Sequence, residues 1–153
     1  MKADQMTRLV ERYGDLSFQV NKMGEVLINN ELDDSLTLEQ DAVLRYIREN
    51  QPCTSSGLSK AFYVEKSAVT AIINRLVNKN FIERERSEED RRVVYLKLTK
   101  QGEQFQMECQ ERVNRIIEKI ISQFDEKEIE SFMKTYEKLA NLLENHLKEM
   151  KGV

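Results

Sequence analysis

The stretch that decides the fold runs from Lys66 to Thr99 and reads KSAVTAIINRLVNKNFIERERSEEDRRVVYLKLT. Its first half repeats apolar residues at helical spacing, which predicts a helix from about Lys66 to Asn78. Its second half alternates apolar and polar residues, which predicts strands over 81–86 and 92–98, joined by a polar tip. A helix followed by a two-stranded hairpin is therefore expected at the centre of the chain.

Two more helices are expected upstream of this stretch. Thr37 can cap a helix over 39–48, and Pro52 follows its end. The run Thr54-Ser55-Ser56 offers a second N-cap, for a short helix that ends near Phe62. Helix, short helix, longer helix and two-stranded hairpin occur in the order of a winged helix-turn-helix, whose longer helix enters the DNA major groove.

Long amphipathic helices are predicted at both ends of the chain. Residues 4–30 carry apolar side chains at alternating spacings of four and three, and Asp33-Asp34-Ser35 follows their end. Thr99 can cap the first of two further helices, whose apolar stripes run over 105–124 and 129–147. A winged-helix core could not cover these stripes alone, so we expect two chains to bury them against each other. The residues assigned to this dimer interface are Leu9, Tyr13, Leu16, Leu139, Leu143 and Leu147.

Charge is spread unevenly along the chain, whose net charge is −3. Residues 54–100 contain ten Lys or Arg and six Asp or Glu, whereas the parts before and after them carry −4 and −3. A basic centre between acidic ends indicates one segment that faces an anion. The expected fold is mainly α, with an N-terminal dimerisation helix (1–36), a winged-helix DNA-binding region (37–100) and C-terminal dimerisation helices (101–153).

Composition argues against several other classes of protein. The chain has no run of eighteen apolar residues and its N-terminus lacks an apolar signal core, so we expect no membrane span. Cys53 and Cys109 cannot form a disulfide framework, which favours the reducing cytoplasm. His146 is the only histidine, and no Gly-rich phosphate loop or nucleophile–base pair appears. We therefore expect neither an enzyme nor a metal or cofactor site.

The predicted recognition helix has one apolar face, which leaves its other face for DNA. Hydroxyls, an amide and basic groups on that face suit base edges and phosphates, although an ordinary solvated helix face would carry similar residues. The residues assigned to DNA here are Lys66, Ser67, Thr70, Asn74 and Arg75, together with Ser55 at the start of the short helix.

The hairpin carries a second group of candidates. Asp90 and Arg92 are two residues apart, so on a strand they would lie on one side and could pair. The pair would hold the guanidinium at the tip, where it fits a narrow minor groove. Arg84, Arg86 and Arg91 add positive charge nearby. Incidental charges on a solvated hairpin are the alternative interpretation.

Taken together, these residues resemble the pattern of the MarR family. That pattern has a serine and a threonine on the recognition helix, Arg-Leu near its end, a D-x-R wing and an L-x-L-T-x-x-G exit. The matching residues are Ser67, Thr70, Arg75, Leu76, Asp90, Arg92, Leu96, Leu98, Thr99 and Gly102. The long flanking helices agree as well, so the resemblance covers nearly the whole chain.

The resemblance implies a homodimer with intertwined terminal helices that binds pseudo-palindromic operators in double-stranded DNA, usually as a repressor. It also implies that DNA is often released when a small aromatic effector binds the protein or when a thiol is oxidised. By position, Ser67, Thr70 and Arg75 match recognition-helix residues, and Arg92 matches a wing arginine that Asp90 orients.

Two positions depart from the family pattern. Ala71 stands where many members carry a larger polar or basic residue, and its methyl group removes a base or phosphate contact. Asn74 stands where many carry aspartate, which would loosen a salt bridge with a nearby arginine. Cys53 precedes the short helix, whose N-terminus could lower its pKa for oxidant sensing, whereas Cys109 lies on an apolar stripe and would be packed.

Alternatives stay open at two points. A winged helix that binds another protein would keep the apolar pattern but would not need Arg92 at its tip. The methionines and aromatic residues of the first helix could line a ligand pocket or pack in a core.

Overall fold

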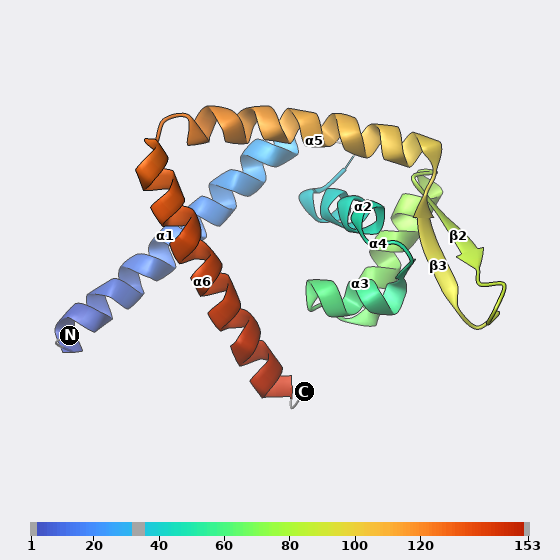
Figure 1. Cartoon of the computed structure of the whole chain (residues 1–153), viewed down its shortest axis with the longest axis horizontal. Helices are drawn as coiled ribbons and strands as arrows, with labels where there is room; N and C mark the ends of the chain where they lie inside the picture. Colours follow the sequence, from blue (N-terminus) through green and yellow to red (C-terminus); the bar gives the residue numbers. More distant parts are fainter. Residues whose placement is uncertain (1–2, 32–35, 152–153) are drawn as a thin grey trace. The chain divides into compact units, whose positions relative to one another are not determined.

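The computed structural model of the chain describes residues 3–31 and 36–151, so the predicted helix end at 33–35 lies outside the described residues. Two compact units are present, Met1–Val113 and Asn114–Val153. The predicted helices and both predicted wing strands are confirmed. In chain order the elements are α1 (Ala3–Glu31), α2 (Leu38–Glu49), β1 (Cys53–Thr54), α3 (Ser55–Phe62), α4 (Lys66–Asn78), β2 (Ile82–Arg86), β3 (Val94–Leu98), α5 (Lys100–Ile121) and α6 (Glu126–Lys151) (Figure 1).

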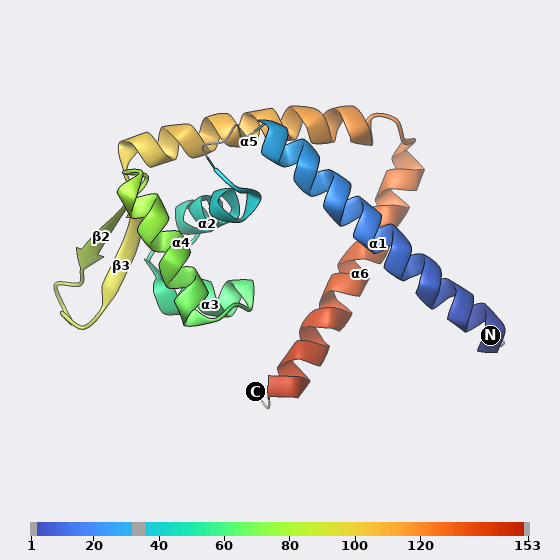
Figure 2. The ribbon, with the colours of Figure 1, turned by 180° about the vertical axis from the view of Figure 1, so that it is seen from behind.

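The core of the first unit lies among α2, α3, α4 and the sheet. Figure 2 shows the three helices gathered beside the β2–β3 hairpin. Apolar side chains from each of these elements are fully buried there, and they include Leu44, Ile47, Leu58, Ile73, Leu76, Ile82 and Leu96. The predicted apolar face of α4 therefore packs inward, which turns its polar face outward.

Side-chain caps begin the helices where the sequence predicted them. The hydroxyl of Thr37 accepts from the backbone N–H of Gln40, whose side chain accepts from Thr37 in return. Thr54 caps α3 by accepting from Gly57, 3.1 Å away. Thr99 accepts from the backbone N–H of Gly102 at the start of α5. These bonds satisfy N–H groups that a helix leaves unpaired in its first turn.

The sheet has three strands, so the prediction of a two-stranded sheet was incomplete. β3 pairs antiparallel with β2 on one side, with Ile82 opposite Leu98, and with β1 on the other, with Cys53 opposite Leu96. β1 contains two residues, which is too short for an alternating pattern to appear in the sequence. It covers the edge of β3 near α3.

The end of α4 leads directly into the sheet. Asn80 adopts a left-handed conformation, with φ of 58°. The backbone N–H of Phe81 donates to Leu76, and that of Asn80 donates to Val77, both over 2.9 Å. This is the paired hydrogen-bond pattern of a Schellman motif, with asparagine in the place that glycine usually holds. Thr99, at the far end of the hairpin, donates its backbone N–H to the Phe81 carbonyl, so both ends of the wing meet at one point.

Gly102 allows α5 to begin at that same point. A Cβ atom at this position would overlap the backbone carbonyl of Phe81. The ring of Phe81 also stacks on Phe105, with ring centroids 4.7 Å apart. The glycine of the exit motif is therefore required by a close contact between two backbone segments.

A buried polar pair joins α2 to α5. Asp41 and Gln106 are both buried, and Asp41 Oδ1 and Gln106 Oε1 have no hydrogen-bond partner among the described residues. Desolvation raises the pKa of Asp41, although Arg45, the Gln106 side chain and Arg48 act in the opposite direction. A buried ionised carboxylate with an unpaired oxygen is costly.

We expect Gly102→Ala to destabilise the fold by about 3 kcal/mol, because backbone atoms cannot move aside as a flexible side chain could. Thermal or urea unfolding measures the effect. Gly57→Ala is the matched control, since its Cβ would meet only the Thr54 hydroxyl at an ordinary 3.5 Å. Equal stability of the two variants would contradict the proposed backbone contact.

Replacing Asp41 by asparagine should stabilise the protein at pH 7, since it removes the cost of the buried charge. The pKa of Asp41 is raised in the folded protein, so wild-type stability falls as pH rises through the window above 3.8. The advantage of the variant should shrink as pH is lowered toward 4. Urea unfolding at pH 7 and pH 4.5 tests both statements, and a less stable variant at pH 7 would contradict them.

Candidate nucleic-acid interface

The polar face of α4 is the first part of the candidate interface. The side chains that the sequence assigned to this face are all exposed, whereas Val69, Ile72, Ile73 and Leu76 are buried. The exposed set consists of Lys66, Ser67, Thr70, Asn74 and Arg75. Ser55, the first residue of α3, is exposed as well.

Thr70 is held by its own helix. Its hydroxyl donates to the backbone carbonyl of Lys66, 2.8 Å away and one turn earlier. Because a carbonyl oxygen can only accept, the hydroxyl hydrogen is committed to this bond. The oxygen of Thr70 therefore offers only its lone pairs to a partner outside the helix.

Asn74 connects the helix to the wing. Arg84 on β2 donates from Nη2 to Asn74 Oδ1 over 2.6 Å. We expected asparagine in place of aspartate to weaken a contact with a nearby arginine. The neutral Asn74 amide nevertheless still binds the Arg84 guanidinium, so the contact is kept. Both side chains are exposed, so the contact lies on the outer surface between α4 and β2.

Asp90 and Arg92 form the predicted pair, but through a turn and not through a strand. Arg92 donates from Nε to Oδ1 and from Nη2 to Oδ2 of Asp90, both over 3.1 Å, and its backbone N–H donates to Oδ1 over 3.0 Å. These bonds from Arg92 hold the pKa of Asp90 below its usual value. β2 ends at Arg86 and β3 begins at Val94, so the pairing by strand alternation was wrong. The Asp90 carboxylate accepts from the backbone N–H of Arg92, two residues later, so the contact is formed locally within the turn.

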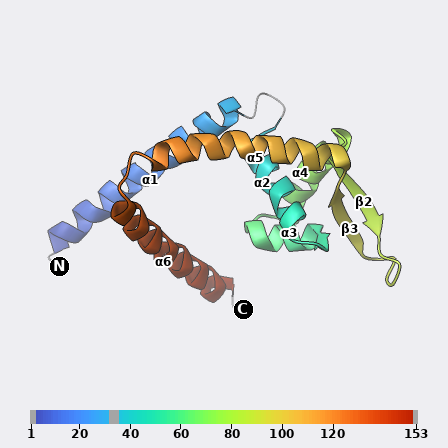
Figure 3. The same ribbon diagram turned by 45° about the horizontal axis from the view of Figure 1, so that its top comes forward.

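The wing projects away from α2, α3 and α4, as Figure 3 shows. The side chain of Arg92 is 91% exposed even though it is paired. Arg86 and Arg91 are exposed on the same hairpin. Sequence reasoning missed one contact there, an ion pair between Lys97 and Glu85 that raises the pKa of Lys97. The strand register could have indicated it, because Glu85 lies opposite Tyr95 and Lys97 is its diagonal neighbour.

The two cysteines do not form a reactive site. Cys53 is 3% exposed and its burial raises the pKa of the thiol, so the expectation of a pKa lowered by a helix N-terminus was wrong. β1 places this side chain in the core, where desolvation outweighs the helix dipole. Cys109 is 1% exposed, as its place on an apolar stripe predicted. The described residues contain no cluster of side chains that could hold a metal ion.

Apolar stripes remain uncovered on the long helices of each unit. On α1, Leu9, Tyr13 and Leu16 are about half exposed, and the remaining apolar residues of that stripe are similar. On α6, Tyr136 and Leu143 are about half exposed as well. The aromatic residues and methionines of α1 are therefore about half exposed or more, and they are not buried in the core of the first unit. None of the helices in 3–31 and 36–151 is long and apolar enough to cross a membrane.

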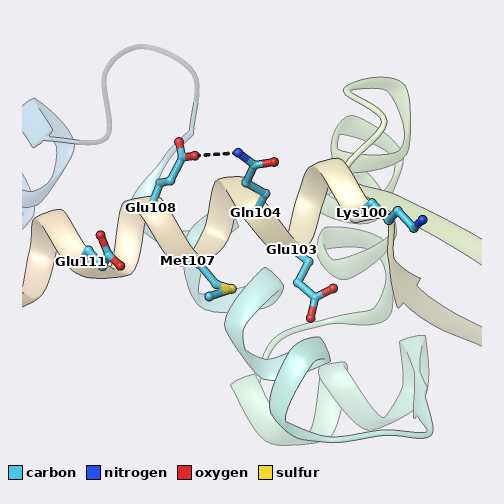
Figure 4. Close-up of a pocket in the computed structure, with 6 residues that line it drawn as sticks. All are labelled: Lys100, Glu103, Gln104, Met107, Glu108 and Glu111. Atoms are coloured by element: carbon cyan, nitrogen blue, oxygen red, sulfur yellow. Dashed lines mark hydrogen bonds between the residues drawn. The ribbon is translucent and has the colours of Figure 1, made fainter.

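A shallow hollow on α5 is not suited to a small aromatic effector. All of its lining residues come from this one helix, and Figure 4 draws Gln104 and Glu108 above the helix and Glu103 and Met107 below it. Gln104 donates to Glu108 over 3.1 Å. The other lining residues are Lys100 and Glu111. Such an open surface on a single helix encloses nothing, so an effector stays a prediction.

The sequence of this chain is similar to those of known transcriptional regulators. The model of the MarR family matches residues 36–94, which contain α2 to the start of β3. YpoP of Bacillus subtilis, an uncharacterized HTH-type transcriptional regulator, is 31% identical over an alignment of 122 residues, and the match covers 76% of this chain and 76% of that protein.

Two solved structures with DNA have the same fold. Streptococcus pneumoniae FabT in complex with DNA is 31% identical with a TM-score of 0.76, covering 92% of this chain and 98% of that chain. A cysteine-to-serine mutant of Escherichia coli MarR complexed with operator DNA is 27% identical with a TM-score of 0.76, covering 85% of this chain and 94% of that chain.

We expect neither cysteine of the folded protein to react readily with a thiol reagent. Burial of both side chains and the raised pKa of Cys53 keep the thiolate scarce and inaccessible. Reaction with 5,5′-dithiobis(2-nitrobenzoate) at pH 7.5 should be slow in the native state and fast in denaturant. Rapid labelling of Cys53 in native protein would contradict this burial and restore an oxidant-sensing role.

Proposed function

This chain belongs to the MarR family of transcriptional regulators, and from that premise we propose that a homodimer of it binds pseudo-palindromic DNA through α4 and the wing. The observation that carries the proposal is the bidentate Asp90–Arg92 contact at an exposed hairpin. An arginine held on a projecting loop fits the narrow minor groove, where negative potential is concentrated.

The recognition helix would lie in the adjacent major groove. Its exposed face combines the hydroxyls of Ser67 and Thr70 with the amide of Asn74 and two basic side chains. This combination can reach base edges and phosphates. Phosphates along the same face would be bound by the basic side chains and by one hydroxyl. These are Lys66, Arg75, Arg84, Arg86, Arg91 and Ser55.

Two chains are needed to cover the apolar stripes of α1 and α6. Half-exposed leucine and aromatic side chains along helices this long are unfavourable in water, and burial would contribute roughly 25 cal/mol per Å². A two-fold dimer presents its recognition helices to half-sites about one helical turn apart, so the operator would be an inverted repeat. The acidic balance of the two ends is compatible with their lying away from DNA.

We further infer that the protein acts in the cytoplasm as a repressor of transcription and is not an enzyme. Its curated relatives are transcriptional regulators. A small effector would release the DNA only if it bound the DNA-binding form of the protein less tightly than a second form that does not bind DNA.

The wing arginine should contribute affinity at every operator sequence. Arg92→Ala should weaken binding and reduce the slope of log affinity against log salt by about one, because one cation fewer displaces counterions. Asp90→Ala should weaken binding less, since it frees the arginine without removing it. Fluorescence anisotropy at several salt concentrations measures both variants.

Arg115→Ala serves as the control for that experiment, because it removes the same charge from an exposed site outside residues 54–100. It should leave the affinity and the salt slope close to wild type. A winged helix that binds another protein would show no operator binding in any of these variants. If Arg92→Ala bound the operator with the same affinity as wild type, the role proposed for the wing would be contradicted.

The dimer should depend on the stripe of α6. Aspartate at both Leu139 and Leu143 should produce monomer or aggregate and abolish operator binding, since two charges would lie in the interface. Analytical ultracentrifugation gives the state of association directly. The control places aspartate at Lys138 and Asn141, which are exposed and lie off the stripe. A wild-type monomer that still binds one half-site tightly would contradict the architecture.

A further inference from the structure

The contact between Arg84 and Asn74 has a direct consequence for base recognition. The guanidinium lies 2.6 Å from Asn74 Oδ1 and donates to it. A guanidinium has five N–H donors and no acceptor, so the oxygen, and not the nitrogen, of the amide must face it. The orientation of the Asn74 side chain is therefore set by a residue of the neighbouring strand.

This orientation leaves the Asn74 amide nitrogen for an external partner. The side chain is exposed on α4, one turn after Thr70, on the face that we assign to the major groove. It presents two N–H donors there. Its oxygen has two lone pairs, and the charged guanidinium already occupies one of them.

Asparagine usually reads adenine with both atoms of its amide, the oxygen accepting from N6 and the nitrogen donating to N7. Here adenine would have to bring its amino group to the oxygen that already binds Arg84. Two donor groups, one of them a cation, would then crowd one oxygen, and their positive N–H groups would repel each other. Guanine instead offers two acceptors, O6 and N7, to the free N–H groups.

We propose that Arg84 determines the base preference of Asn74, by holding its oxygen so that the side chain selects guanine over adenine. This inference rests on the proposed function and specifies the base chemistry of the same site. Arg84 acts here as a positioning residue, because it works through Asn74 and need not touch a base. An aspartate at position 74 would also bind the guanidinium but would have no N–H to donate, so the effect depends on the amide.

The test is a selection from randomised inverted-repeat DNA with four proteins. These are wild type, Asn74→Ala, Arg84→Met and Arg86→Met. Wild type should enrich a guanine in each half-site, and Asn74→Ala should lose that preference, which identifies the position. Arg84→Met releases the oxygen, so the guanine-to-adenine ratio at this position should fall by about fivefold or more. Arg86→Met removes the same charge from the same strand and should lower affinity without changing that ratio.

The outcomes are distinguishable. An unchanged ratio in Arg84→Met, an equal change in Arg86→Met, or a wild-type preference for adenine would overturn the role assigned to Arg84 while leaving operator binding intact. Failure of wild type to enrich any sequence would overturn the proposed function, and this inference with it. Anisotropy with the selected operator and with 7-deazaguanine at the identified position provides a direct check, since loss of N7 should weaken wild type more than Asn74→Ala.

Discussion

The close approach of Gly102 to the backbone of Phe81 is the constraint on which the rest of the structure depends. The Schellman end of α4, the start of β2 and the start of α5 meet there, and the Thr99 hydroxyl donates to the Asn80 carbonyl over 2.6 Å. Backbone contacts of this kind leave little freedom, because neither partner can rotate away. The recognition helix and the wing are therefore oriented from one point.

A second connection acts farther along the same face. Arg84 reaches from β2 to Asn74, so the wing contacts the recognition helix through side chains as well as through its root. Because the amide is neutral, this contact leaves the positive charge of the guanidinium unbalanced. The same residue thus orients a polar group and contributes to the positive potential of the basic segment.

Polar and apolar surfaces are divided between parts of the chain. The winged-helix region buries its apolar residues within one protomer, whereas α1 and α6 leave theirs half exposed. An isolated helix with such a stripe has no core of its own to cover it. Folding of the winged-helix region can therefore be completed within one chain, and the proposed dimer would cover the stripes of the long helices.

Local patterns in the sequence were enough to determine much of this protein. The periods of α4, β2 and β3 follow from side-chain spacing, and Thr37, Thr54 and Thr99 cap helices with atoms only three residues apart. The Asp90–Arg92 contact is also local, although a turn produces it. Tertiary structure alone decided three features that join distant residues. These are the strand at Cys53, the burial that raises the pKa of its thiol, and the choice of Arg84 as the arginine that contacts Asn74. A sequence motif can indicate a glycine at position 102, but only the folded chain brings the Phe81 backbone against it. The reason is that the direction and packing of the chain determine which backbone atoms meet, and the spacing of residues in the sequence does not.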